Sequence, residues 1–112
     1  MLKNTTFDIG QGDTDDPLYA TLYMEGTTTP IDLTNVDSVK FSMRTPLGDI
    51  VIDEVDAEVV GEDQKLGRVR YLWHDGDTDI AGTFQGRFRV YRDGKRFYAP
   101  NKGYIRVNIT PF

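Results

Sequence analysis

The segment Thr83-Phe84-Gln85-Gly86-Arg87-Phe88-Arg89-Val90 alternates apolar or small residues with polar ones. A period of two is typical of a β-strand that buries one face and leaves the other in water. The same alternation recurs over residues 38–44, 68–73 and 105–109, and helical spacing is not evident anywhere. These four segments are therefore predicted to be half-buried strands.

Four further strands are expected, over Thr5 to Ile9, Tyr19 to Met24, Ile50 to Val60 and Arg96 to Ala99. The acids within Ile50 to Val60 also leave an edge strand or a short helix open there. Asp93-Gly94 predicts a tight hairpin, because this pair accepts positive φ at low cost. Residues typical of turns predict loops over 10–17, 25–35, 46–49, 61–67, 75–82 and 100–103.

About eight short strands separated by turns predict an all-β protein. We expect an antiparallel β-sandwich of about seven to nine strands, forming a single domain over residues 1–112. The side chains expected to face its core are listed here: Phe41, Met43, Tyr71, Trp73, Phe84, Phe88, Val107 and Ile109.

The composition excludes several classes of function. The chain has no cysteine, which rules out a disulfide, a thiolate metal site and a cysteine nucleophile. Residues 1–8 lack the apolar stretch of a signal peptide, and no apolar run is long enough to span a membrane. A net charge of −5 argues against nucleic acid as the partner. We expect a soluble protein with no cofactor.

The small net charge hides an uneven distribution along the chain. Residues 1–67 carry 14 acidic and 4 basic side chains, a net charge of −10, whereas residues 68–112 carry 4 acidic and 9 basic ones, a net charge of +5. Such a split suits head-to-tail or ring contacts between copies. The alternative is that the two halves neutralise each other within one monomer.

Arginine and tyrosine residues are the candidates for partner binding. Arg87 and Arg89 share the outward face of one predicted strand, Arg106 lies on that of another, and Tyr91 and Tyr104 are close in sequence. Neighbouring strands would join them in a basic aromatic patch, of the kind enriched at protein interfaces. The alternative is a solvated sheet face whose arginines pair with acids.

The acid-rich loop Asp75-Gly76-Asp77-Thr78-Asp79 begins like a calcium loop but lacks the required Gly and Glu further on. A looser oxygen site and turn capping by the Asp side chains are the alternatives. A small hydrolase that uses Asp77 or Asp79 is a third hypothesis. Because no acid, base and nucleophile are placed together, we expect no catalysis and assign neither catalytic nor metal-binding residues.

The stretch from Asp77 and Asp79 through Gly82 to Phe84 has the form of the corner that opens a late strand in immunoglobulin-like sandwiches. In that fold an aromatic residue ties the corner through its hydroxyl group, and a disulfide cysteine follows two residues after this aromatic residue. Phe84 and Gly86 occupy these positions here. We therefore expect the corner to be held by packing, without the hydroxyl bond.

The chain resembles the N-terminal immunoglobulin-like domain of phage baseplate upper proteins, which occur in tailed phages and prophages. The resemblance rests on residues spread over nearly the whole chain: Phe7-Asp8-Ile9, Gly12-Asp13-Thr14, Asp32-Leu33-Thr34, Val39 to Arg44, Gly67, Val69, Tyr71, Trp73, Asp77, Thr78, Ala81, Gly82, Phe84, Phe88, Asp93-Gly94, Pro100 and Tyr104 to Ile109.

The resemblance implies a non-enzymatic component of the virion, assembled in the host cytoplasm. Such a module docks by protein–protein contacts on tail-tip, baseplate, neck, head or fibre proteins, and positions a fibre or receptor-binding element. A carbohydrate-binding or adhesion module is the alternative, with Tyr19, Tyr23, Tyr91, Tyr98 and Tyr104 as its candidate aromatics. That alternative expects several of these tyrosines to be in the core.

Overall fold

The computed structural model describes residues 6–24, 26–100 and 103–112. Thr5 of the first predicted strand, Glu25, and residues 101–102 of the last predicted loop lie outside the described residues. The fold is all-β, as predicted. Its elements are β1 (Thr6–Gly10), β2 (Leu18–Thr21), β3 (Ser38–Arg44), β4 (Ile50–Val59), a single-turn 3-10 helix (Gln64–Leu66), β5 (Arg68–Tyr71), β6 (Gly82–Arg92), β7 (Lys95–Ala99) and β8 (Ile105–Thr110).

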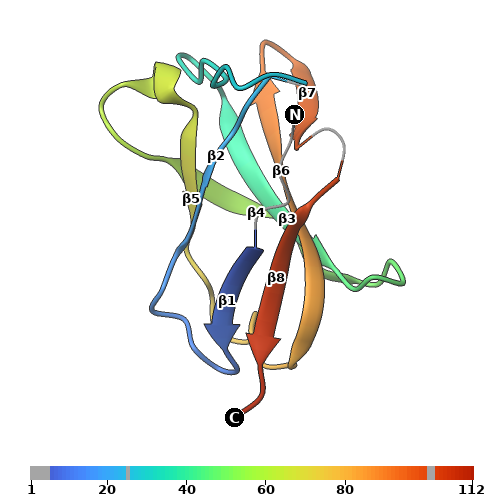
Figure 1. Cartoon of the computed structure of the whole chain (residues 1–112). Helices are drawn as coiled ribbons and strands as arrows, with labels where there is room; N and C mark the ends of the chain where they lie inside the picture. The colour runs from blue at the N-terminus through green and yellow to red at the C-terminus, as the bar shows by residue number, and fades with distance from the viewer. Residues whose placement is uncertain (1–5, 25, 101–102) are drawn as a thin grey trace.

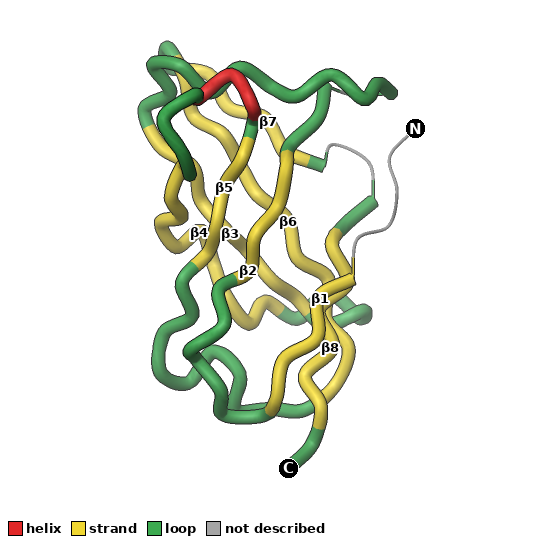
Figure 2. Tube along the Cα trace, turned by 60° about the vertical axis from the view of Figure 1, so that its left-hand side comes forward, coloured by secondary structure: helices red, strands yellow, loops and turns green. Residues whose placement is uncertain are grey.

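The eight strands form one continuous sheet in the order β1-β8-β6-β3-β4-β5-β2, with β7 also paired to β6. The sheet curls until it is nearly barrel-shaped, so that β2 and β5 lie over β3 and β6 (Figures 1 and 2). Ile50–Val59 is a strand, and the short helix considered there is absent from these described residues. No helix in the described part of the chain has the length and apolarity needed to cross a membrane.

The sheet is mixed, so the prediction of a wholly antiparallel fold was wrong at one pair. β1 and β8 run parallel, from Thr6 opposite Arg106 to Gly10 opposite Thr110. Alternation of side chains reports which face is buried and carries no information on strand direction. The first and last strands of the domain therefore lie side by side although about 100 residues separate them.

β4 produces the curl because it pairs with two different strands. Its first part pairs with β3, and its last residues pair with β5 through Glu58 and Val59. Within the part paired with β3, the register shifts between Ile52 and Val55, and Glu54 there has a left-handed φ of 47°. A β-bulge of this kind bends its strand and increases the twist of the sheet.

β6 organises the opposite side of the sheet. One edge of β6 pairs with β3 over Gln85–Tyr91. The other edge of β6 pairs with β8 at Gly82–Gly86 and with β7 at Phe88–Arg92. The β6–β7 hairpin turns at Asp93-Gly94, where both residues have positive φ, as their sequence predicted. Arg87 is therefore the one residue of β6 opposite the break between β7 and β8.

The side chains predicted for the core are buried, each at most 6% exposed. Phe41 is central: its ring centroid lies 4.5 Å from that of Tyr71, 5.1 Å from Phe88 and 6.0 Å from Trp73. Gly86 provides the space for this ring, because a Cβ atom there would lie 2.9 Å from the ring of Phe41. The position at which we considered a disulfide cysteine is thus filled by aromatic packing.

Two predicted strands end early. β5 ends at Tyr71, and Trp73 follows it outside the ladder, although its ring is buried and packs against Phe7 and Tyr71. Its indole Nε1 donates a hydrogen bond of 3.0 Å to the carbonyl of Asp16. β2 ends at Thr21, because the chain then forms an isolated bridge between Tyr23 and Pro30.

We expect Trp73→Ala to lower the free energy of unfolding by about 3 to 5 kcal/mol, because it empties a buried aromatic site. Chemical denaturation monitored by circular dichroism measures this change. Tyr19→Ala is the control, since its side chain is 54% exposed and its loss should cost less than about 1 kcal/mol. A loss below about 1 kcal/mol for Trp73→Ala would contradict the packing described above.

Candidate functional site

The outward side of β6 brings together most of the predicted partner-binding residues. Arg87, Arg89 and Tyr91 alternate along this strand, and Arg106 of β8 is in register with Gln85 on the same face. Tyr104 precedes β8 and borders this surface at the break between β7 and β8. We call the surface formed by Arg87, Arg89, Tyr91, Tyr98 and Arg106 the β6 face.

Tyr98 of β7 is the centre of the β6 face. The guanidinium carbons of Arg87 and Arg89 lie 4.5 and 4.0 Å from the centroid of its ring. Such cation–π contacts hold both arginines on one ring. Sequence reasoning left Tyr98 out of the arginine patch, although the Asp93-Gly94 hairpin fixes the register that places it opposite Arg89.

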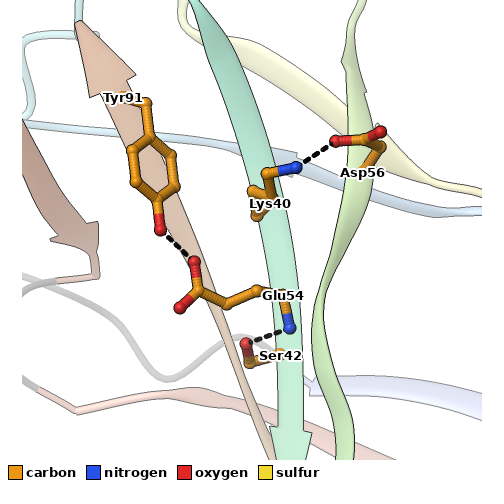
Figure 3. Close-up of polar contacts among 5 residues, drawn as sticks. All are labelled: Lys40, Ser42, Glu54, Asp56 and Tyr91. Carbon is orange, nitrogen blue, oxygen red and sulfur yellow. Dashed lines mark hydrogen bonds and ion pairs between the residues drawn. The ribbon is translucent and has the colours of Figure 1, made fainter. Parts of the chain in front are cut away.

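Glu54 is the second residue that sequence reasoning missed. The bulge in β4 directs its carboxylate toward β6, where it accepts hydrogen bonds from Arg89 Nη1 at 3.1 Å and from the Tyr91 hydroxyl. Its backbone N–H donates to Ser42 Oγ at 2.9 Å (Figure 3). No sequence signal marks this residue, because the bulge depends on how β3 and β4 pair.

Part of the charge on this side of the sheet is neutralised locally. Lys40 and Asp56 form an ion pair of 2.7 Å, and this hydrogen bond raises the pKa of Lys40 (Figure 3). Interaction with Tyr91 raises the pKa of Arg89, and Glu54 acts in the same direction. Among the described residues no ion pair includes Arg87 or Arg106. The alternative, in which the arginines of the sheet face pair with acids, thus describes Arg89 but not Arg87 and Arg106.

A hollow of about 150 Å³ lies beside the β6 face. The residues that line it include Arg44, Ile50, Asp53, Arg87, Tyr98 and Tyr104. Arg44 Nε also donates a hydrogen bond of 3.0 Å to Gln85 Oε1. Two arginines and two phenol groups around a small hollow can bind a carboxylate or another planar acceptor.

The acid-rich loops meet at one end of the molecule, where the β1–β2 and β5–β6 connections come together (Figure 1). We call residues 10–17 and 74–81 the acidic end. Gly12 N–H donates to the Thr78 carbonyl at 3.0 Å, and the Thr78 hydroxyl, which is fully buried, donates to the Asp13 carbonyl at 2.8 Å. Gln11 Nε2 donates to the Asp79 carbonyl. These bonds fix the two loops against each other.

Asp77 ties the predicted corner. Its Oδ2 accepts hydrogen bonds from the Tyr71 hydroxyl at 2.6 Å and from the His74 N–H at 2.9 Å. We expected this corner to lack a hydroxyl bond, because Phe84 has no hydroxyl group. That expectation was wrong, since Tyr71 of β5 provides the hydroxyl. Phe84 is buried, and Gly82 begins β6 with a positive φ of 146°. Asp77 thus acts as a turn former, the structural alternative considered for the loop.

The other acids of the loop are not gathered into a site. In the described ranges, no three acidic or histidine side chains are grouped closely enough to hold one metal ion. Asp75 and Asp79 have exposed side chains. Both carboxylates therefore face solvent.

The tyrosines are mostly at the surface, unlike the expectation that several lie in the core. Tyr71 is buried, whereas Tyr19, Tyr23 and Tyr98 are exposed and Tyr91 and Tyr104 are partly exposed. The difference arises because these other side chains lie on outward or edge positions of the curled sheet.

Comparisons with protein-family models, curated proteins and solved structures found no match to this chain.

We expect Tyr71→Phe to lower the stability at pH 7 by about 1 to 3 kcal/mol, because Asp77 loses a hydrogen-bond donor. Burial, followed by the hydrogen bond to Asp77, raises the pKa of Tyr71 above its ordinary value of 10.0. The unfolded chain releases this proton near pH 10 and the folded chain retains it. The stability due to Tyr71 is therefore complete below about pH 10 and falls by about 1.4 kcal/mol per pH unit above it.

Urea denaturation of the wild type and Tyr71→Phe between pH 7 and 12 measures this difference. The stability advantage of the wild type should shrink above pH 10. Tyr23→Phe, which removes one hydroxyl from an exposed side chain, should leave the stability at pH 7 unchanged. A difference between wild type and Tyr71→Phe that is independent of pH would contradict the role given to the hydroxyl.

Proposed function

We propose that this protein is a non-enzymatic structural component of a tailed phage or prophage particle. It docks on other virion proteins by protein–protein contacts and positions a fibre or receptor-binding element, and it is located in the virion after assembly in the host cytoplasm. The baseplate or tail tip, the neck and the head surface are its candidate locations.

The virion assignment rests on the sequence resemblance, and the stacking of Arg87 and Arg89 on Tyr98 is the structural observation that supports docking by protein–protein contacts. Arginine and tyrosine are enriched at the centres of protein interfaces. Here the aromatic ring orders the arginines before any partner arrives. Tyr98 is still 38% exposed, so a partner can cover it.

We also propose that the fold is related to the immunoglobulin-like sandwich, and the strand order supports this. If the strands are lettered A to G in chain order, with β7 and β8 together as G, then β3-β6-β8 correspond to C-F-G and β4-β5-β2 to D-E-B. These are the two groups of strands in an immunoglobulin-like sandwich. The chain departs from that pattern where β4 joins both groups and where β1 pairs with β8.

The virion assignment predicts that the chain copurifies with intact particles of the phage or induced prophage that encodes it. Mass spectrometry of gradient-purified particles should detect it in a fixed ratio to the major capsid protein. Fitting the domain into density of the particle then gives its position. Absence from intact particles, while the capsid protein is detected, would overturn the proposal.

A carbohydrate-binding module is the second candidate, and one groove favours it. Tyr23, Met24 and Phe97 line an open groove of about 390 Å³, together with Asp32 and Arg92. Exposed aromatic rings provide apolar faces on which sugars can stack, and the charged groups can bind hydroxyls. Hydrogen bonds from Thr34 lower the pKa of Asp32, so this side chain is an acceptor at neutral pH.

A glycan array and a pull-down with host cells distinguish the two functions. The carbohydrate module predicts binding that is lost in Tyr23→Ala and retained in Arg87→Ala, because Arg87 lies outside the groove. The virion scaffold predicts no binding to glycans by any of these proteins. Binding that Tyr23→Ala leaves unchanged would exclude the groove as the sugar site.

A further inference from the structure

The hollow beside the β6 face has the charge and shape to accept a carboxylate. Arg44 and Arg87 line it, while Glu54 is already bound by Arg89 and Tyr91. Asp53 is the other acid that lines the hollow, and no ion pair within the described residues includes it. Two arginines therefore outnumber the acid that is left to balance them. A carboxylate from outside would restore the balance and gain charge-assisted hydrogen bonds.

Exposed apolar side chains belong to the segment between Arg44 and Asp53, two residues that both line the hollow. The β3–β4 connection projects from the body of the molecule (Figure 1), and it carries Leu47, which is 94% exposed. Ile50, at the start of β4, is 61% exposed and lines the hollow itself. A partner that fits this surface should carry an exposed apolar residue next to its acids, since interfaces combine an apolar centre with charged surroundings.

The acidic end of the same chain has these properties. It contains six aspartates, Asp13, Asp15, Asp16, Asp75, Asp77 and Asp79, and neither lysine nor arginine. Ile80 lies among them and is 68% exposed. Asp75 has an exposed side chain beside Gly76, which has positive φ at the turn. One backbone hydrogen bond and two bonds from side chains to carbonyls join the two loops and hold this end in one shape.

We propose that the hollow beside the β6 face of one copy receives the acidic end of a second copy. Asp75 then approaches Arg87 and Arg44, and Ile80 packs near Leu47 and Ile50. The residues of the acidic end are not among those that line the hollow, so the contact forms between copies. This inference deepens the proposed structural role by naming one partner of the chain, a second copy of itself.

Sedimentation velocity of the purified chain over a range of concentrations tests the contact. The wild type should self-associate at low ionic strength. The association should weaken in about 1 M salt, where the Debye length is about 3 Å. Arg87→Glu and Asp75→Lys should each weaken it by about tenfold or more, because each places like charges in contact.

A mixture of the two variants is the decisive sample. The hollow of Arg87→Glu is complementary to the acidic end of Asp75→Lys, so mixing them should restore association that neither shows alone. Arg68→Glu and Glu62→Lys make matched charge changes at exposed positions outside both surfaces and should leave the association within about twofold of the wild type. Circular dichroism and the unfolding midpoint check that each variant is folded. If Arg87→Glu unfolds, Asp75→Lys at its exposed turn still tests the contact.

Three outcomes would overturn the inference. The first is a wild-type chain that stays monomeric at low salt, and the second is a mixture that fails to associate. The third is an equal effect of the control variants. A monomeric chain that is nevertheless present in purified particles would overturn this contact and leave the proposed function standing. A chain that self-associates but is absent from particles would support this contact and overturn the proposed function.

Discussion

The packing of Phe41 against Gly86 is the contact on which both the core and the β6 face depend. The ring of Phe41 occupies the space where any larger residue at position 86 would place its Cβ, and it contacts Tyr71 and Phe88 from there. It thereby fixes β3 against β6 in one register. The same register determines which side chains face outward together, so the order of the surface follows from the packing of the interior.

The bulge in β4 connects the shape of the sheet with its surface chemistry. β4 stays paired with β3 on both sides of the bulge, as far as Ala57, and its last residues then pair with β5. The residue at the bend, Glu54, has a left-handed conformation that costs free energy in a residue with a Cβ. Its carboxylate and its N–H each find partners, on Arg89, Tyr91 and Ser42, which offset that cost.

Local sequence was sufficient for most of the strands and for the core. Alternation identified the buried face of β6, and Asp93-Gly94 identified its hairpin with β7. The parts that could not be predicted all depend on contacts between remote segments. The parallel pairing of β1 with β8 is one of them, and the reach of Glu54 toward β6 is another.

In the candidate site, too, local features could be predicted from the sequence and contacts between remote segments could not. The outward placement of Arg87 and Arg89 followed from a period of two, and their register with Tyr98 follows from a two-residue turn. The hydroxyl of Tyr71 at the Asp77 corner was missed, because the expected donor was sought two residues before Gly86 and the actual one comes from an earlier strand. Sequence patterns assign faces well, and they assign tertiary partners only where a short turn fixes the pairing.

The pairing of β1 with β8 has a consequence for how the domain forms during its synthesis. β1 precedes β8 by about 100 residues, and β8 is the strand with which β1 pairs among the described residues. An N-terminal strand without its partner exposes unpaired backbone groups, and these are open to pairing with other chains. The edge of β1 that faces β8 is therefore covered only after β8 has been made.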